Sequence, residues 1–299
     1  MDLRSLIRSL TPSFLLEFWR KQKKKQTRSL LEEQRLAGAD LTFYKIVQTL
    51  TAIGIEQGDT VLVHASLSKM GFVEGGPKKI VDALIQVVGE TGNILMPTSP
   101  NGLLQLDYIR KLKVFDVLQS PSKLGALTEY FRTLPGVKRS AHPTEPVCAL
   151  GPDAAYLTEG HFGELTPYTS KSPFYRVAEK GGKILYLGVT LANAGTSLHL
   201  LEDAVNFKYP VYYDEVFEVK IIREDGTNRL VKTKVHNPEY SKKRRCDELI
   251  PRFLDKNVCK EFQFGKAHSY IFDARKMLEQ MIIDYEQAGI TMYTPKGEA

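Results

Sequence analysis

The stretch from Asp59 to Ser99 constrains the fold most, because it has the pattern of a strand, a helix and a second strand. Apolar, mostly β-branched residues over 60–64 predict the first strand, and residues 93–96 predict the second. Between them, Gly75-Gly76-Pro77 predicts a helix start, and Gly89 with Gly92 marks its end. We therefore expect a βαβ unit whose first loop carries small residues, so that a ligand can approach the backbone there.

The first turn of this predicted helix carries two positive charges, Lys78 and Lys79, although the helix dipole disfavours positive charge at that end. An anion bound to the free N–H groups of the Gly75–Pro77 entry would give both lysines a partner. The alternative is that both lysines point into water, at a cost of a few tenths of a kcal/mol. The loop is neither a Walker A loop nor a GxGxxG fingerprint, so nothing here indicates nucleotide hydrolysis or NAD chemistry.

Length and composition bound the class of protein. The 299 residues, 42% of them apolar, can form one large domain or two small ones with a full core. No run of ~18 apolar residues predicts a membrane span, and residues 1–10 lack the features of a secretory signal. Cys148, Cys246 and Cys259 form no C-x-x-C pair, which indicates free thiols in a reducing cytoplasm.

The net charge of +6 is concentrated near the N-terminus, because residues 1–35 hold nine Lys and Arg against four acidic residues. The rest of the chain is close to neutral, which argues against a nucleic-acid partner. Apolar and aromatic residues at helical spacing over 6–19 precede the cationic run at 20–28, a pattern typical of a helix on an anionic membrane surface. The alternative is a helix docked on the body or on a second subunit. We expect residues 1–38 to form a basic amphipathic extension and residues 39–299 an α/β domain.

Further elements follow in order. Residues 41–53 predict a helix, residues 100–119 look irregular, and residues 183–189 predict a buried strand. Period-two alternation from Phe217, with a turn at 224–226, predicts a β-hairpin that ends near Val235. The class is therefore α/β with a hairpin toward the C-terminus.

His199 is the strongest catalytic candidate, because Glu202 follows it by three residues and both then share one helix face. An imidazole oriented by a carboxylate is the usual general base for removing a proton from an amine or hydroxyl. The alternative is a histidine that caps or packs at a helix start. A second histidine, His142, precedes proline next to Arg139 and Ser140, two residue types that bind phosphate or carbonyl groups. No HExxH, Cys/His or GxSxG spacing occurs, and we predict no metal.

Four sequence blocks carry a resemblance to a known family. VHASLSKMGFVEGGPKKIVDALIQVVGETGNILMPT, RSAHPTEPVCALGP, SPFYRVAEKGGKILYLGV and TSLHLLED resemble, in this order, the aminoglycoside 3-N-acetyltransferase family. The resemblance covers residues 40–275. It implies a central mixed sheet flanked by helices, and acetyl transfer from acetyl-CoA to an amine of an amino sugar.

The resemblance also implies roles for particular residues. His199 would deprotonate the attacking amine, with Glu202 and His236 as the other catalytic residues, and Glu239 and His142 would contact the acceptor. The first loop, the following helix start and the RSAHP motif would bind acetyl-CoA. The expected cofactor-binding residues are His64, Ser66, Leu67, Ser68, Gly71, Val73, Gly75, Gly76, Pro77, Arg139 and Ser140.

One region departs from the family pattern. Antibiotic-modifying members resemble one another in an acidic cluster soon after the hairpin, which binds the polycationic drug. Here residues 234–240 are followed by Lys242, Lys243, Arg244 and Arg245, a patch that would repel such a drug. We therefore expect an acceptor with phosphate or carboxylate, such as a nucleotide- or lipid-linked amino sugar of surface-polysaccharide assembly. The alternatives are an aminoglycoside 3-N-acetyltransferase, or a non-catalytic CoA-binding or membrane-recruited scaffold protein.

Overall fold

The computed structural model describes residues 40–101 and 104–297, together with some helical residues between 22 and 36. The amphipathic pattern at residues 6–19 lies outside the described residues, so the membrane-surface reading and the boundary at residue 38 stay predictions. Within the part of the chain that is described, no helix is both long and apolar enough to cross a membrane.

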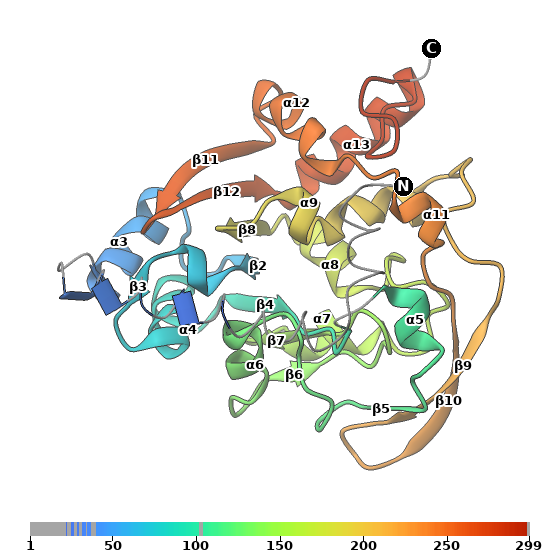
Figure 1. The fold of residues 1–299 in the computed structure, drawn as a ribbon, viewed down its shortest axis with the longest axis horizontal. Helices are drawn as coiled ribbons and strands as arrows, with labels where there is room; N and C mark the ends of the chain where they lie inside the picture. The colour runs from blue at the N-terminus through green and yellow to red at the C-terminus, as the bar shows by residue number, and fades with distance from the viewer. Residues whose placement is uncertain are drawn as a thin grey trace.

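A seven-stranded mixed sheet forms the centre of the fold (Figure 1). Its strands, in spatial order, are β11 (Cys259–Phe264), β12 (Ala267–Asp273), β8 (Lys183–Leu187), β2 (Thr60–Ala65), β4 (Asn93–Pro97), β7 (Val147–Leu150) and β6 (Lys138–Arg139). The three central strands β8, β2 and β4 run parallel, and the outer strands pair antiparallel. The expected central mixed sheet is confirmed.

The βαβ unit predicted from residues 59–99 is the middle of this sheet. Helix α4 (Gly76–Val88) connects β2 to β4, and Gly75 before it has a φ of 73°, a conformation that glycine adopts at no steric cost. Alternate strand residues face opposite sides, so that Leu62 packs in one core while Val61 and Val63 pack in the other. Both faces of the sheet are therefore buried, as parallel strands require.

Helices cover the two faces. The face of Val61 packs against α4, α3 (Phe43–Ala52) and α6 (Ala126–Arg132). The opposite face packs against α7 (Ala154–Glu159), α8 (Pro173–Glu179), α10 (Leu200–Ala204), α12 (Ile250–Asp255) and α13 (Ala274–Ala288). The short elements that remain are β1 (Asp40–Leu41), η1 (Leu67–Lys69), β3 (Phe72–Val73), α9 (Leu191–Ala194), η2 (Thr196–His199), α11 (Pro238–Ser241) and η3 (Cys246–Leu249).

A second, three-stranded sheet lies beside the main body, at the lower right of Figure 1. The predicted hairpin is β9 (Phe217–Ile222) with β10 (Asn228–Thr233), and β5 (Val114–Asp116) adds to β9 in parallel. Residues 100–119 were expected to be irregular, but they contain β5 and helix α5 (Gln105–Ile109). Both elements are short, and Phe115 is held by packing on Val219 and Ile221 of the hairpin, so tertiary contacts rather than local pattern determine them.

Candidate active site

The Glu202 carboxylate lies at the centre of the site and binds two imidazoles. His199 Nδ1 lies 2.9 Å from Glu202 Oε1, and His236 Nε2 lies 2.7 Å from Glu202 Oε2. His199 ends η2 and Glu202 lies in the first turn of α10, so a three-residue helical spacing brings them together, as expected. His236 comes from the segment after β10, where it forms an isolated bridge with Tyr212.

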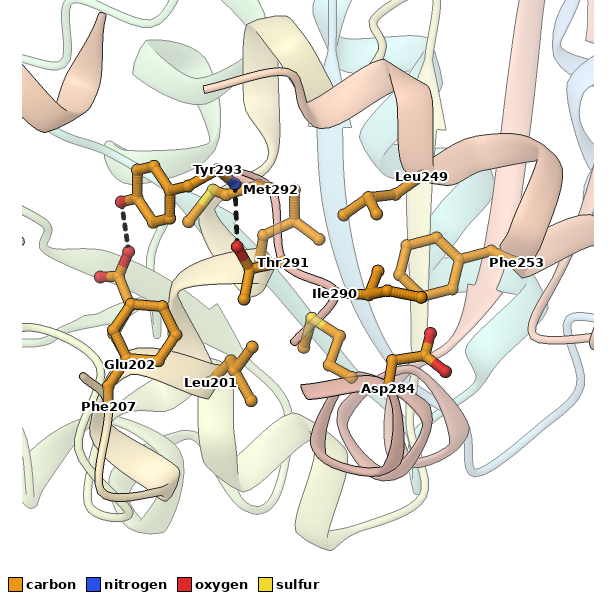
Figure 2. Close-up of a pocket in the computed structure, with 12 residues that line it drawn as sticks. Leu201, Glu202, Phe207, Leu249, Phe253, Asp284, Ile290, Thr291, Met292 and Tyr293 are labelled. Atoms are coloured by element: carbon orange, nitrogen blue, oxygen red, sulfur yellow. Dashed lines mark hydrogen bonds between the residues drawn. The ribbon is translucent and has the colours of Figure 1, made fainter. Parts of the chain in front are cut away.

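A tyrosine completes the contacts of this carboxylate. Tyr293, in the segment after α13, donates its hydroxyl proton to Glu202 Oε1 at 2.6 Å (Figure 2). The Tyr293 backbone N–H donates to Thr291 Oγ1 at 3.0 Å, which holds the local turn. Three donors therefore fix the orientation of Glu202, and this carboxylate is completely buried.

The protonation of His199 follows from its contacts. An ionised Glu202 can accept hydrogen bonds but has no proton to donate. His199 Nδ1 therefore carries the proton of this hydrogen bond, and His199 Nε2 keeps its lone pair. Burial lowers the pKa of His199 to about 3, because its partner Glu202 only partly offsets the cost of burying an imidazolium. At neutral pH the ring is an uncharged base. It stacks on Tyr168 with ring centroids 4.9 Å apart, which restricts its rotation.

Glu202 remains the charged member of the group. Burial opposes its charge, but the two imidazoles outweigh burial and hold the pKa of Glu202 below its ordinary value. A neutral His199 beside a fixed carboxylate is the arrangement of a general base, because the carboxylate stabilises the imidazolium that forms.

The same three side chains have the composition of a metal site. The separations of 2.7 Å and 2.9 Å between Glu202 oxygens and the imidazole nitrogens are hydrogen-bond distances. Ligands around one tetrahedral zinc ion lie ~3.3 Å from each other, as bonds of ~2.0–2.1 Å require. The geometry therefore fits hydrogen bonds between these three side chains better than it fits ligands arranged around one metal ion.

A cavity of about 260 Å³ opens onto this group. His199 and His236 line it, and α5, α9 and α11 contribute to its walls. Its polar lining includes Gln105, Glu145 and Arg244. His199 is thus buried against the protein on one side and borders a space large enough for part of a sugar on the other.

A second cavity, of about 240 Å³, lies at the carboxyl ends of β2 and β4. Val63, His64, Ala65 and Pro97 line it from the strands, and Leu124 lines it from the loop before α6. Open α/β sheets bind ligands at this edge. Four residues line both cavities, which therefore adjoin: Glu145, Asn193, Ala194 and Thr196.

A hydrogen-bonded chain connects this junction to the catalytic group. Gln105 donates from Nε2 to Glu145 Oε1, and its own Oε1 accepts from the His236 backbone N–H at 3.1 Å. His236 in turn contacts Glu202. Arg244 also borders the first cavity, and its Nε and Nη2 are covered atoms without an acceptor among the described residues.

The predicted cofactor loop only partly reaches these cavities. His64 lines the second cavity, stacks on Tyr186 at 5.0 Å and lies 3.4 Å from Thr196 Oγ1. The lining of both cavities includes none of the other residues predicted from Ser66 to Pro77, at least in the described part of the chain. Their role in binding acetyl-CoA stays a prediction.

The two lysines at the start of α4 have partners within the chain. Lys78 Nζ pairs with Asp82 at 2.8 Å, and Lys79 Nζ lies 5.5 Å from the centre of the Phe43 ring. Lys78 is nevertheless 61% exposed, so the structure agrees in part with the alternative that the lysines face water. An anion at this helix start also stays a prediction.

The RSAHP motif is internal. Arg139 donates to Thr98 Oγ1 at 3.0 Å and to the Val117 carbonyl at 3.1 Å, so its guanidinium ties loops together. Ser140 Oγ lies 3.0 Å from His161 Nδ1, and His142 stacks on the same ring at 4.5 Å. These contacts describe packing, and the predicted roles of Arg139 and Ser140 toward the cofactor and of His142 toward the acceptor remain predictions.

The basic segment after the hairpin divides into two parts. Glu239 on α11 and Lys242, the residue that follows this helix, form an exposed ion pair at 2.7 Å near the rim of the first cavity. Lys243 and Arg245 are exposed as well, whereas Arg244 turns inward. The expected cationic patch is therefore weaker at the surface than the sequence indicates, and one of its charges lines the cavity itself.

Several residues of the site were not identified from the sequence. Gln105 lay in the stretch expected to be irregular, and Tyr293 lies beyond the four blocks of the resemblance. Glu145 stood inside the quoted RSAHPTEP block, and its position between two prolines was the one available signal. Tyr168 lay in a loop without periodicity, where nothing indicated a ring that would stack on His199.

Comparisons with known proteins agree with the geometry. A family model described as aminoglycoside 3-N-acetyltransferase matches residues 62–283, about three quarters of the chain. The chain is 29% identical over 266 residues to aminoglycoside N(3)-acetyltransferase IX of Micromonospora chalcea, covering 82% of this chain and 94% of that protein.

Solved structures are similar as well. The aminoglycoside acetyltransferase AAC(3)-Xa superposes with a TM-score of 0.74 at 27% identity, covering 88% of this chain and 98% of that one. A binary complex of AAC-IIIb with CoASH has a TM-score of 0.70 at 25% identity and covers 83% of this chain and 97% of that one. The mixed α/β fold is thus shared along most of the chain.

Proposed function

The chain belongs to the aminoglycoside 3-N-acetyltransferase family, a family of acyltransferases with acetyl-CoA as co-substrate, and we propose that it acetylates an amine of an aminoglycoside-type amino sugar. The observation that carries the proposal is the neutral His199, hydrogen-bonded to a buried Glu202 and bordering a cavity that adjoins a second one at the sheet edge. Two adjoining cavities fit a reaction between two substrates.

In the proposed reaction, His199 Nε2 removes a proton from the acceptor nitrogen as that nitrogen attacks the thioester carbonyl. The Glu202 charge stabilises the imidazolium that results, while His236 and Tyr293 keep the carboxylate in place. A positioned general base typically contributes ~10²–10⁴-fold to such a step. We propose that the acetyl-CoA thioester lies in the second cavity, beside His64 and Thr196.

A second candidate concerns the acceptor. Arg244 borders the cavity, and two of its nitrogens are covered and lack an acceptor among the described residues, which favours a substrate with a carboxylate or phosphate near its amine. Such a substrate would be a nucleotide- or lipid-linked amino sugar of surface-polysaccharide assembly. The names of the relatives support the aminoglycoside acceptor more directly, and we keep it as the main proposal.

The test is acetyl-CoA turnover by the full chain, followed with a thiol reporter over three groups of amines: polycationic aminoglycosides, neutral amino sugars and nucleotide-linked amino sugars. We expect the highest kcat/KM for an aminoglycoside. A higher value for the nucleotide-linked group would support the second candidate instead. CoA binding without turnover of any amine would favour a non-catalytic protein.

The role of His199 is tested in the same assay. His199→Ala is expected to lower kcat at least ~10²-fold, because the base is lost. His268→Ala is the matched control, since His268 is half-exposed on β12 and is not among the described residues that line either cavity. Equal activity of the two variants would contradict the general-base role.

A further inference from the structure

Glu145 is the titratable side chain at the junction of the two cavities. Of the four residues that line both, the other three are Asn193, Ala194 and Thr196, none of which exchanges a proton near neutral pH. If the acetyl-CoA thioester fills one cavity and the amine the other, as the proposed function has it, the reacting atoms meet beside Glu145. This carboxyl group takes no part in the base catalysis described above.

The chain holds Glu145 in place on both sides. Its backbone N–H points to His142 Nδ1 at 3.4 Å, and its Oε1 accepts a hydrogen bond from Gln105 Nε2. Gln105 also accepts the backbone N–H of His236, which contacts Glu202. The carboxyl group is therefore positioned with respect to the catalytic imidazoles, with Gln105 as the connection.

The reaction needs a second proton transfer. When the carbon–sulfur bond breaks, sulfur leaves as a thiolate, and ordinary thiols have a pKa of ~8.5, so the product is largely protonated at neutral pH. In the proposed step His199 takes the amine proton and holds it on an imidazolium beside the charged Glu202. A carboxylic acid beside the sulfur is a separate source from which the leaving group can take its proton.

We propose that Glu145 is the general acid that protonates the sulfur of CoA as it departs. His199 Nε2 takes one proton from the acceptor nitrogen, the new carbon–nitrogen bond forms, and the carbonyl carbon releases sulfur with the electron pair of the carbon–sulfur bond. The Glu145 proton goes to that sulfur. The products are the N-acetylated amine and CoA thiol, and solvent then returns a proton to Glu145 and removes one from His199.

The electrostatic surroundings agree with this role. Burial raises the pKa of Glu145 to about 7, although the hydrogen bond from Gln105 and the charge of Arg244 act in the opposite direction. Among the described residues, the phenols Tyr108 and Tyr168 also interact with it electrostatically, and the neutral ring of His142 accepts its backbone N–H. General acid catalysis requires a group that is acidic enough to give up its proton and is still protonated in a useful fraction of the molecules. A carboxyl group that is partly protonated at pH 7 meets both requirements.

The test replaces Glu145 by glutamine, which keeps an oxygen for Gln105 but has no acidic proton. With acetyl-CoA, kcat of Glu145→Gln is expected to fall ~10²-fold while KM for the amine stays within about twofold. With an acetyl thioester of an acidic thiophenol, whose thiolate leaves without a proton, the loss is expected to shrink to less than ~10-fold. Glu224→Gln, at the exposed turn of the hairpin, is the matched control.

The outcomes separate the alternatives. An equal loss with both thioesters, a higher KM for the amine at unchanged kcat, or no change would each overturn the general-acid role. A wild-type measurement covers the case in which the variant does not fold: kcat/KM with acetyl-CoA should decline above pH ~7 as Glu145 loses its proton, and this decline should be absent with the aryl thioester. A decline with both thioesters, or with neither, overturns the role. A wild-type enzyme that acetylates no amine refutes the proposed function itself.

Discussion

The stacked pair of His142 and His161 makes a specific prediction about stability at acidic pH. Both rings are buried, at 1% and 0% exposure. His161 Nε2 lies 3.0 Å from the Pro167 carbonyl, which can only accept, so this nitrogen donates and Nδ1 accepts from Ser140. Burial lowers the pKa of both rings, because a second proton on either ring would place a charge in the protein interior. Folding therefore requires both histidines to be neutral.

The size of the effect follows from His161. Burial lowers the pKa of His161 to about 3, below the ordinary value of 6.5 that applies in the unfolded chain. Because the folded pKa is the lower one, the stabilisation is complete above pH ~6.5 and is lost as the pH falls toward 3. Between pH 7 and pH 5 the unfolded chain takes up this proton and the folded chain does not, so about 2 kcal/mol of unfolding free energy is lost.

The assay is urea denaturation at pH 7 and at pH 5, with the free energy of unfolding extrapolated at each. His161→Gln cannot titrate and should lose about 2 kcal/mol less than wild type between these two values. Glu145 has a raised pKa, so its contribution to the free energy of unfolding increases as the pH falls, opposite to that of His161. The quantity to compare is therefore the difference in this pH dependence between wild type and His161→Gln. His268→Gln, at an exposed position, should behave like wild type. An equal pH dependence in wild type and His161→Gln would refute the reasoning.

Two further predictions concern the ends of the chain. Tyr293→Phe removes one donor to Glu202, and it should lower the free energy of unfolding by about 1–3 kcal/mol and also lower kcat. The control Tyr285→Phe removes a hydroxyl bonded to Asn206 and Lys208 and should leave kcat unchanged. Equal kcat values for the two variants would argue against a role for Tyr293 in positioning Glu202. Removal of residues 1–35 should abolish co-sedimentation with anionic liposomes, because these residues carry most of the net positive charge; unchanged co-sedimentation would contradict the membrane-surface reading.

The central part of the fold was predictable because local pattern and tertiary structure agree there. The strands at Thr60–Ala65 and Asn93–Pro97 are continuous apolar runs, and the helix at Gly76–Val88 between them has a clear helical period with glycine at both ends. The same is true of the hairpin around Gly226. In contrast, β11 at Cys259–Phe264 alternates charged and apolar residues only weakly and takes its place through pairing with β12.

From residue spacing, the site was predictable only where two of its residues are neighbours in sequence. His236, which was expected from the family resemblance, also contacts Glu202. His199 and Glu202 were found because three residues is the spacing of a helix face. Gln105, Glu145 and Tyr293 join them from elements more than 40 residues away in each case, and no local pattern encodes such contacts. Arg244 shows the same limitation, since a run of four basic residues gives no indication of which one turns inward.

The segment that follows α13 determines when, during synthesis of the chain, the active site can be completed. It reaches Glu202 through Tyr293 and also anchors the backbone of Arg245, whose N–H donates to the Met292 carbonyl at 2.8 Å. Among the described parts of the site, this segment is the last to be synthesised. A growing chain can thus contain all seven strands of the main sheet, the last of which ends at Asp273, and still lack a fully oriented carboxylate. Any fusion that keeps this segment from docking is expected to produce a folded but poorly active protein.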